Sequence, residues 1–144
     1  AGKLKELSRR AKRAGAHNIT PRPIESSKTI KKQYNSADRV LIDAPCSGLG
    51  VLKRNPDAKW KLQPEFINNI RQTQQEILQS YSKLVKKGGK LVYATCSIFP
   101  SENENQVATF LESNKDYILI RDKTVLPSES GFDGFYMALL ERKA

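Results

Sequence analysis

Two short apolar runs separated by one long amphipathic stretch constrain the fold of this chain more than any other feature. The runs are DRVLIDAP, residues 38–45, and KLVYATC, residues 90–96. A continuous apolar run of this length is typical of a strand buried on both faces of a parallel sheet. Between them, residues 64–89 repeat apolar side chains at helical spacing, after a proline that suits a first helical turn. This order predicts two parallel, neighbouring strands joined by a crossover helix.

The remaining segments extend the same alternation of strands and helices. We expect helices over residues 2–18 and 101–113, the second opened by a capping box of Ser101 and Glu104. We expect strands over residues 116–122 and 131–143, and an extended, proline-containing edge segment over 18–24. Because no helix separates the last two strands, one of them should run antiparallel. The prediction is an α/β layered fold with helices on the faces of the sheet.

Composition limits the class of protein. The chain has 144 residues, a usual size for one domain, and no apolar run near the roughly 20 residues that span a bilayer. It holds two cysteines and no secretory signal, so we expect a cytoplasmic protein with free thiols. One histidine and two cysteines at this spacing form no ligand set, so no metal site is predicted.

The positive charge is concentrated near the start of the chain. The formal net charge is +10, and residues 1–33 hold ten Lys or Arg against two Glu. A basic patch of this kind suits a phosphate backbone, so we expect a nucleic-acid partner. The alternative is a solvated helix face with no partner.

Both cysteines follow the ends of the two predicted parallel strands. Asp43 and Cys46 come at the end of the first strand, and Cys96 at the end of the second. Ligands of open α/β sheets bind beyond the carboxyl ends of the strands. We therefore expect both thiols to face one crevice with the Asp43 carboxylate between them. A buried cysteine is otherwise a small apolar side chain, and Asp43 could simply cap a helix.

The two cysteine motifs resemble a known enzyme family. LIDAPCSGLGVLKRNPDAKW, residues 41–60, and GGKLVYATCSIFPSENENQV, residues 88–107, are similar to the paired cysteine motifs of RNA (cytosine-5) methyltransferases, the Sun or Fmu-like family. The closing segment GFDGFYMALLER, residues 131–142, and the basic segment 3–19 are also similar to that family. The resemblance covers almost the whole chain and implies a class I, Rossmann-like methyltransferase fold with an antiparallel last strand.

The resemblance also implies a mechanism and a cofactor. Cys96 would attack carbon 6 of a cytosine in ribosomal or transfer RNA, and carbon 5 would take a methyl group from S-adenosylmethionine. Cys46 would assist loss of the carbon 5 proton, and Asp43 would contact the base and lie close to the cofactor. Covalent attack fits the chemistry, because it divides one difficult substitution into easier steps.

Two parts of the family pattern are missing from this sequence. The glycine-rich cofactor loop after the first strand and the acid after the second strand have no counterpart in residues 1–144. We therefore expect a partial catalytic domain without its first two strands, inactive alone and binding the cofactor weakly or not at all. We further expect residues 18–24 to pair with the strand over 38–45 or to remain disordered, because an unpaired interior edge is costly.

Two other functions remain open from the residues alone. The chain could be an RNA-binding module that acts through residues 1–33, or a dithiol redox protein that uses Cys46 and Cys96. After the first cysteine motif, Lys53, Arg54 and Trp60 could contact phosphates or stack on a base. For Trp60 we favour a packing role. We expect Gly48 and Gly50 to let the backbone approach a ligand closely.

Overall fold

The computed structural model describes residues 2–144, apart from the side chain of Lys61. These residues form two compact units, 2–32 and 33–144, which are described separately. The first unit holds α1 (Gly2–Arg13) and α2 (Ser27–Lys31). The second holds β1 (Ala37–Asp43), η1 (Leu49–Val51), α3 (Ala58–Lys61), α4 (Pro64–Tyr81), η2 (Ser82–Leu84), β2 (Val85–Thr95), η3 (Pro100–Glu102), α5 (Glu104–Ser113), β3 (Tyr117–Val125), α6 (Pro127–Ser130) and β4 (Phe135–Arg142).

The first unit contains the predicted basic helix and no strand among its described residues. No residue of α1 is buried, and Arg10, Lys12 and Arg13 occupy its last turn, where cations favour the helix dipole. Residues 18–24, expected to pair with the first strand, adopt no regular secondary structure. The pairing prediction is therefore wrong: in the described chain, β1 has β2 as its partner. Two prolines, Pro21 and Pro23, remove donors that a ladder would need.

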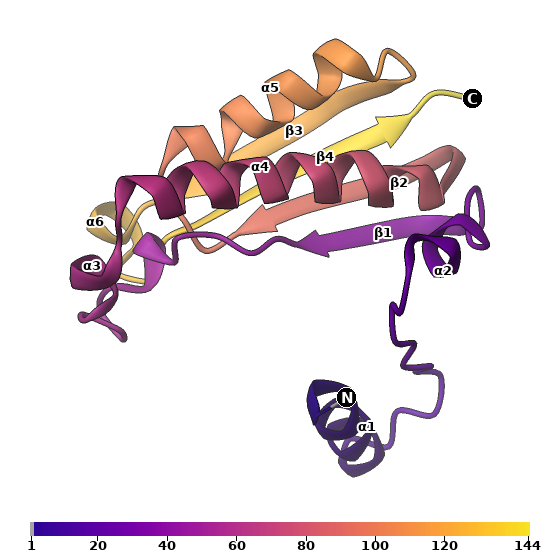
Figure 1. Cartoon of the computed structure of the whole chain (residues 1–144), viewed down its shortest axis with the longest axis horizontal. Coiled ribbons are helices and arrows are strands. Elements are labelled where there is room, and N and C mark those ends of the chain that lie inside the picture. Colours follow the sequence, from indigo (N-terminus) through magenta and orange to yellow (C-terminus); the bar gives the residue numbers. More distant parts are fainter. Residues whose placement is uncertain (1) are drawn as a thin grey trace. The chain divides into compact units, whose positions relative to one another are not determined.

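The second unit is built on a four-stranded sheet in the order β1-β2-β4-β3 (Figure 1). β1 and β2 are parallel, and α4 crosses between them as predicted. β4 is antiparallel to both β2 and β3, so the expected antiparallel last strand is confirmed. The carboxyl ends of β1 and β2 therefore lie at the same end of the sheet.

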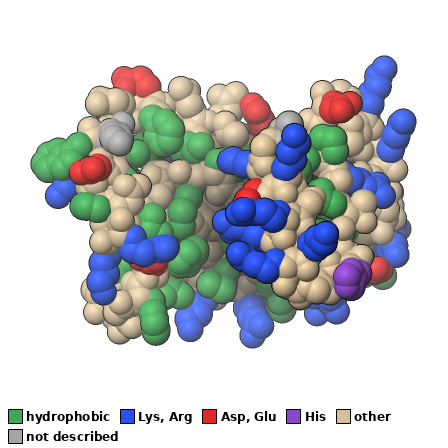
Figure 2. Space-filling model, turned by 90° about the horizontal axis from the view of Figure 1, so that it is seen from below, with side chains coloured by type: hydrophobic (Ala, Val, Ile, Leu, Met, Phe, Trp, Pro, Cys, Tyr) green, Lys and Arg blue, Asp and Glu red, His purple; other side chains and the backbone are tan. Residues whose placement is uncertain are grey.

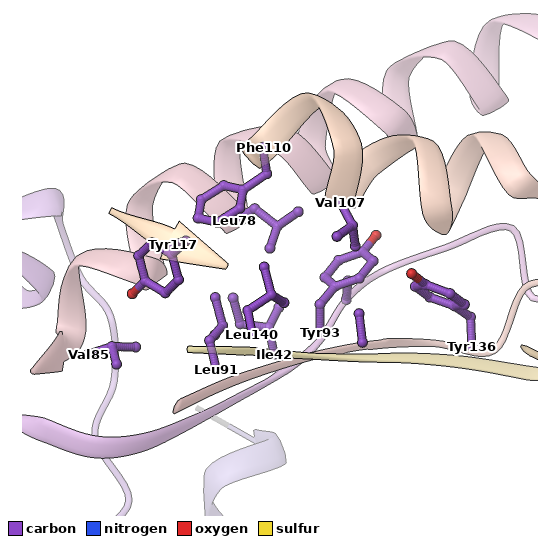
Figure 3. Close-up of a cluster of buried hydrophobic side chains, with 12 residues drawn as sticks. Ile42, Leu78, Val85, Leu91, Tyr93, Val107, Phe110, Tyr117, Tyr136 and Leu140 are labelled. Carbon is purple, nitrogen blue, oxygen red and sulfur yellow. The ribbon is translucent and has the colours of Figure 1, made fainter. Parts of the chain in front are cut away.

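The two long helices of this unit, α4 and α5, cover one face of the sheet. Figure 3 shows Leu78 of α4 and Phe110 of α5 pointing down onto strand residues such as Leu91 and Tyr93. These four side chains are fully buried. Aromatic rings stack edge to face within this core, with the Phe110 and Tyr117 centroids 5.2 Å apart. The core fixes the sheet against the helices and so fixes where the strand ends point.

Three local expectations are corrected by the structure. The predicted long helix ends at Tyr81, and Val85 begins β2, because its β-branched side chain is fully buried beside β1. The expected capping box is absent: Ser101 lies in η3, and α5 starts after Asn103 without a side-chain cap. β1 is not buried on both faces, since Leu41 is 70% exposed and Ile42 is buried. The helices α4 and α5 leave the opposite face of β1 uncovered.

Leu78 faces the core and Leu41 lies on the uncovered face of β1, so their replacement should affect stability differently. Leu78→Ala should lower the free energy of unfolding by roughly 2–5 kcal/mol, because it leaves a cavity beneath α4. Leu41→Ala is the matched control, and its 70% exposure predicts a change within about 0.5 kcal/mol. Urea denaturation of both variants measures the difference. Equal losses would contradict this assignment of faces.

Candidate active site

The two cysteine side chains meet at the carboxyl ends of β1 and β2. The strands are in register with Asp43 opposite Ala94, and the backbone N–H of Ala44 donates to the carbonyl of Ala94 (2.9 Å). After these residues both strands end, and in the loops that follow Cys46 Sγ lies 3.3 Å from Cys96 Sγ. Both cysteines are free and partly buried. The two thiols therefore lie together at one end of the sheet, as the sequence predicts.

Asp43 lies outside the contact between the two sulfurs. The sulfurs touch each other, so the expectation of a carboxylate between them is wrong. Asp43 is exposed and lines a hollow of about 220 Å³ together with Leu41, Ile42, Ile77 and Tyr81. The alternation of side chains along β1 explains this, because Ile42 faces the core and its neighbour Asp43 faces away.

A buried carboxylate joins the two cysteine loops. Glu102 is fully buried, and its Oε2 accepts the backbone N–H of Ser47 at 2.7 Å. Its Oε1 accepts the hydroxyl of Ser97 at 2.8 Å, and Gln74 of α4 donates to Oε2 at 3.2 Å. Ser47 and Ser97 each follow one of the cysteines. A single side chain therefore holds the residue after each thiol, and buried carboxylates require such partners.

Further buried hydrogen bonds tie this carboxylate to the sheet and to α4. The Tyr93 hydroxyl donates to the backbone carbonyl of Glu102 at 2.8 Å. The Asn103 side chain donates to the Ser97 carbonyl at 2.9 Å, and the Gln74 side chain donates to the Pro45 carbonyl at 2.9 Å. The loops that carry both cysteines are thus held from three directions, which limits the movement of each thiol.

Two glycines let the loop after Cys46 pack against two other backbone segments. The Gly50 N–H donates to the Cys96 carbonyl at 2.9 Å, and the Gly134 N–H donates to the Gly50 carbonyl at 2.7 Å. A Cβ on Gly50 would lie 2.1 Å from the Gly134 oxygen and 2.7 Å from the Cys96 oxygen. Gly50 therefore approaches protein backbone, where a ligand was expected, and no larger residue fits without displacing it.

The environment of Cys46 changes its acidity. Burial is the main cause that raises the pKa of the Cys46 thiol, the hydrogen bond with Cys96 is the second, and the resulting pKa is about 12. At neutral pH Cys46 therefore keeps its proton and can donate its S–H to the sulfur of Cys96. The contact is a hydrogen bond in which Cys46 is the donor whenever Cys96 is ionised.

One feature of the sequence could have predicted part of the buried hydrogen-bond network, although the spacing of apolar residues does not show it. A serine follows each cysteine, at positions 47 and 97, and their hydroxyl oxygens lie 3.3 Å apart. This repeated Cys-Ser pair indicates a second contact beside that of the sulfurs. Nothing in the sequence predicts that Glu102 is buried, because an acidic residue near the start of a helix usually faces water.

No group of three or more His, Cys, Asp or Glu side chains within residues 2–144 is arranged to hold a metal ion. Of the helices described, none combines the length and apolarity that crossing a bilayer demands.

The contact between the thiols predicts how Cys46 responds to loss of its partner. Cys96→Ala removes one cause of the raised pKa and leaves burial in place, so the pKa of Cys46 should fall from about 12 but stay above its ordinary value. Alkylation follows the thiolate fraction, so its pH midpoint should move to lower pH, with about a tenfold gain in thiolate for each unit. Alkylation rates across pH, located by mass spectrometry, measure the midpoint. The same midpoint in both proteins would show that Cys96 does not act on Cys46.

The buried carboxylate predicts a large loss of stability when it is removed. Glu102→Ala leaves the Ser47 N–H, the Ser97 hydroxyl and the Gln74 amide without their acceptor, and should cost about 3 kcal/mol or more of unfolding free energy. Glu102→Gln keeps one acceptor oxygen and should cost less. Glu112→Ala, on the exposed side of α5, is the control and should change stability by less than about 0.5 kcal/mol. A Glu102→Ala protein as stable as this control would contradict the network, and urea denaturation decides it.

Comparison with known proteins places the chain in a family. The family model described as 16S rRNA methyltransferase RsmB/F matches residues 1–141. Ribosomal RNA small subunit methyltransferase B of Proteus mirabilis is 47% identical over 106 residues, covering 74% of this chain and 25% of that protein. The chain thus spans about a quarter of the length of this curated relative.

Solved structures share the fold of the chain. The crystal structure of PH0851 has a TM-score of 0.90 and 33% identity, and covers 96% of this chain and 34% of that chain. NSun6 from Pyrococcus horikoshii, solved with SFG, has a TM-score of 0.86 and 24% identity, covering 99% of this chain and 39% of that one. The predicted α/β methyltransferase fold is confirmed, and the family model matches nearly the whole of this chain. The chain therefore belongs to the 16S rRNA methyltransferase RsmB/F family.

Proposed function

We propose that this chain is the cysteine-bearing part of an RNA cytosine-5 methyltransferase that acts on ribosomal or transfer RNA. The observation that carries the proposal is the 3.3 Å contact between Cys46 Sγ and Cys96 Sγ at the ends of two parallel strands. Two thiols within reach of one ring can act on adjacent carbons of a pyrimidine. Membership of the family supports ribosomal RNA as the substrate class.

In the proposed reaction Cys96 is the nucleophile. Its thiolate forms a bond to carbon 6 of the cytosine, and the electron pair of the carbon 5–carbon 6 double bond moves to carbon 5. When S-adenosylmethionine is bound, it supplies the methyl group that carbon 5 accepts. Cys46 first releases its own proton to water, and as a thiolate it takes the proton from carbon 5; the double bond forms again, and the Cys96 thiolate leaves. Bonds, protons and electron pairs balance, and no oxidant is needed.

The acidity of Cys46 fits a change of role during this sequence. In the free protein its raised pKa keeps it protonated, so it can stabilise the Cys96 thiolate by a hydrogen bond. When Cys96 bonds to carbon 6, it loses both its negative charge and its capacity to hold the Cys46 proton. Burial, the largest cause of the raised pKa of Cys46, remains, but the hydrogen bond with Cys96 and the charge of Cys96 no longer raise it, so that pKa falls at the step where a base is needed.

Asp43 is the proposed contact to the base and the cofactor. Its exposed carboxylate shares the hollow with Tyr81 and Leu41, which offer an aromatic and an apolar surface. A volume of about 220 Å³ is below the roughly 300–1,000 Å³ of most ligand sites, so the hollow fits one end of S-adenosylmethionine and not the whole molecule. The residues present would hold the end of the cofactor that lies nearest to the thiols.

We propose that this chain holds only part of a cofactor site. The chain covers about a quarter of the curated relative, 25% of its length. We propose that the rest of the cofactor site is formed by polypeptide that precedes the family motifs found here. On this proposal the chain alone binds the cofactor weakly or not at all.

A second candidate function is RNA binding without catalysis, through the basic first unit. All of the Lys and Arg residues of α1 are exposed, and no residue of that helix is buried in the unit. Figure 2 shows many exposed Lys and Arg side chains on the face of the molecule seen from below. Such a surface binds phosphates without regard to sequence.

The test compares two cysteine variants in the complete protein that carries this chain, with RNA and S-adenosylmethionine. Cys46→Ala should accumulate a protein–RNA adduct that survives a denaturing gel, because Cys96 cannot leave once carbon 5 keeps its proton. Cys96→Ala should form no adduct and no product. The measurement is the band that contains both protein and labelled RNA.

The other outcomes separate the alternatives. An adduct only with Cys96→Ala would reverse the two roles. Methylation by both variants without any adduct would reject the mechanism. RNA retained on a native gel, but no adduct and no methylation, would favour the binding module.

A further inference from the structure

Two aromatic side chains of the second unit project into solvent. Trp60 of α3 is 76% exposed, and Phe132, between α6 and β4, is 75% exposed. The expectation that Trp60 packs inside the described chain is therefore wrong. Large aromatic rings normally bury most of their surface, so two exposed rings indicate a surface that binds something. We call Trp60 and Phe132 the aromatic pair.

The segments that carry the aromatic pair are held side by side. Arg54 forms an ion pair with Asp133 at 2.5 Å, and Lys53 Nζ donates to the Gly131 carbonyl at 3.5 Å. Both contacts join the loop before α3 to the turn that carries Phe132. Figure 1 shows α3 and α6 at the same end of the sheet, and hydrophobic side chains project at that end in Figure 2. The loop before α3 and the turn that carries Phe132 therefore form one surface at this end of the sheet.

This surface adjoins the cysteine pair. The Gly50 N–H donates to the Cys96 carbonyl at 2.9 Å, and the Gly50 carbonyl accepts the Gly134 N–H at 2.7 Å. Phe132 thus lies two residues from a backbone contact that reaches the loop of the proposed nucleophile. An RNA strand with one nucleotide at the thiols would place the neighbouring nucleotides over this end of the sheet.

The charge of the surface favours stacking over simple phosphate binding. Lys59 Nζ lies 4.7 Å from the centroid of the Trp60 ring, which leaves the rest of the ring in water. Arg54 is engaged with Asp133, so its charge is largely balanced. The surface offers two exposed rings, with the Lys59 ammonium group beside one of them, which suits the flat face of a base and a nearby phosphate.

We propose that Trp60 and Phe132 form a stacking platform for unpaired RNA bases that flank the target cytosine. The proposal rests on the proposed function, because it takes the target from the cysteine pair. A pyrimidine whose ring carbons must be reached by two thiols has to leave its helical stack or come from a single strand. Its neighbours then lose stacking partners, and exposed aromatic rings beside the site replace them.

The test uses the fluorescence of Trp60, which is the sole tryptophan of the chain. A short single-stranded RNA with one cytidine among adenosines is added to the chain. Stacking should quench the tryptophan emission and protect it from acrylamide. Base-paired RNA of the same length should do neither at the same concentration, because its bases are already stacked.

Three variants locate the contact. Phe132→Ala should weaken the binding that quenches Trp60 by about five- to 150-fold, the range expected for the loss of one stacked base. Trp60→Phe, followed by fluorescence anisotropy of labelled RNA, keeps a ring and should weaken binding by less than about threefold, whereas Trp60→Ala should match Phe132→Ala. Ile120→Ala, a 45% exposed residue of the edge strand β3, is the control and should leave binding unchanged.

The outcomes separate this proposal from the proposed function. Quenching that persists in Cys96→Ala, with no adduct in Cys46→Ala, would support the platform and reject the covalent mechanism. An emission unaffected by single-stranded RNA, or equal affinity of Trp60→Ala and Ile120→Ala, overturns the platform whatever the adduct shows. In that case the aromatic pair faces another polypeptide segment.

Discussion

The buried carboxylate of Glu102 is the constraint on which the geometry of the site depends. It accepts hydrogen bonds from the residue after each cysteine, Ser47 and Ser97, and from Gln74 of the helix that crosses between the strands. A buried charge is tolerated only when it is fully hydrogen-bonded, so the loops must close around it. The closure brings two loops that are far apart in sequence to one fixed separation.

The sheet supplies the other half of this geometry. Parallel pairing of β1 and β2 brings both chains to the same end, and the shared core beneath α4 and α5 keeps the strands in register. The sulfurs then meet at 3.3 Å, a distance at which Cys96 adds to the raised pKa of the Cys46 thiol. The proposed exchange of roles between Cys46 and Cys96 is a consequence of that contact, because bonding of one sulfur changes the acidity of its neighbour.

The loops that follow the cysteines connect the cysteine pair to the surface that carries the exposed aromatic rings. Gly50 and Gly134 pack backbone against backbone, so the turn that carries Phe132 is attached to the loop of Cys46 and Cys96. Ion pairing of Arg54 with Asp133 adds to the attachment. Charged residues that a sequence assigns to phosphate binding here hold two loops together, and the exposed rings provide the proposed contact to RNA.

The sequence by itself determined the order of elements, the parallel pair and the meeting of Cys46 with Cys96. Local apolar patterns decide these features, and the connection rules of α/β sheets leave few alternatives. Tertiary structure alone decided that Glu102 is buried, that Trp60 is exposed and that Asp43 lies outside the sulfur contact. Each of these depends on which face of a strand or loop meets another segment, and no local pattern records that partner. Residues 18–24 illustrate the same limit, because whether an extended segment joins a sheet depends on the free edge it could reach.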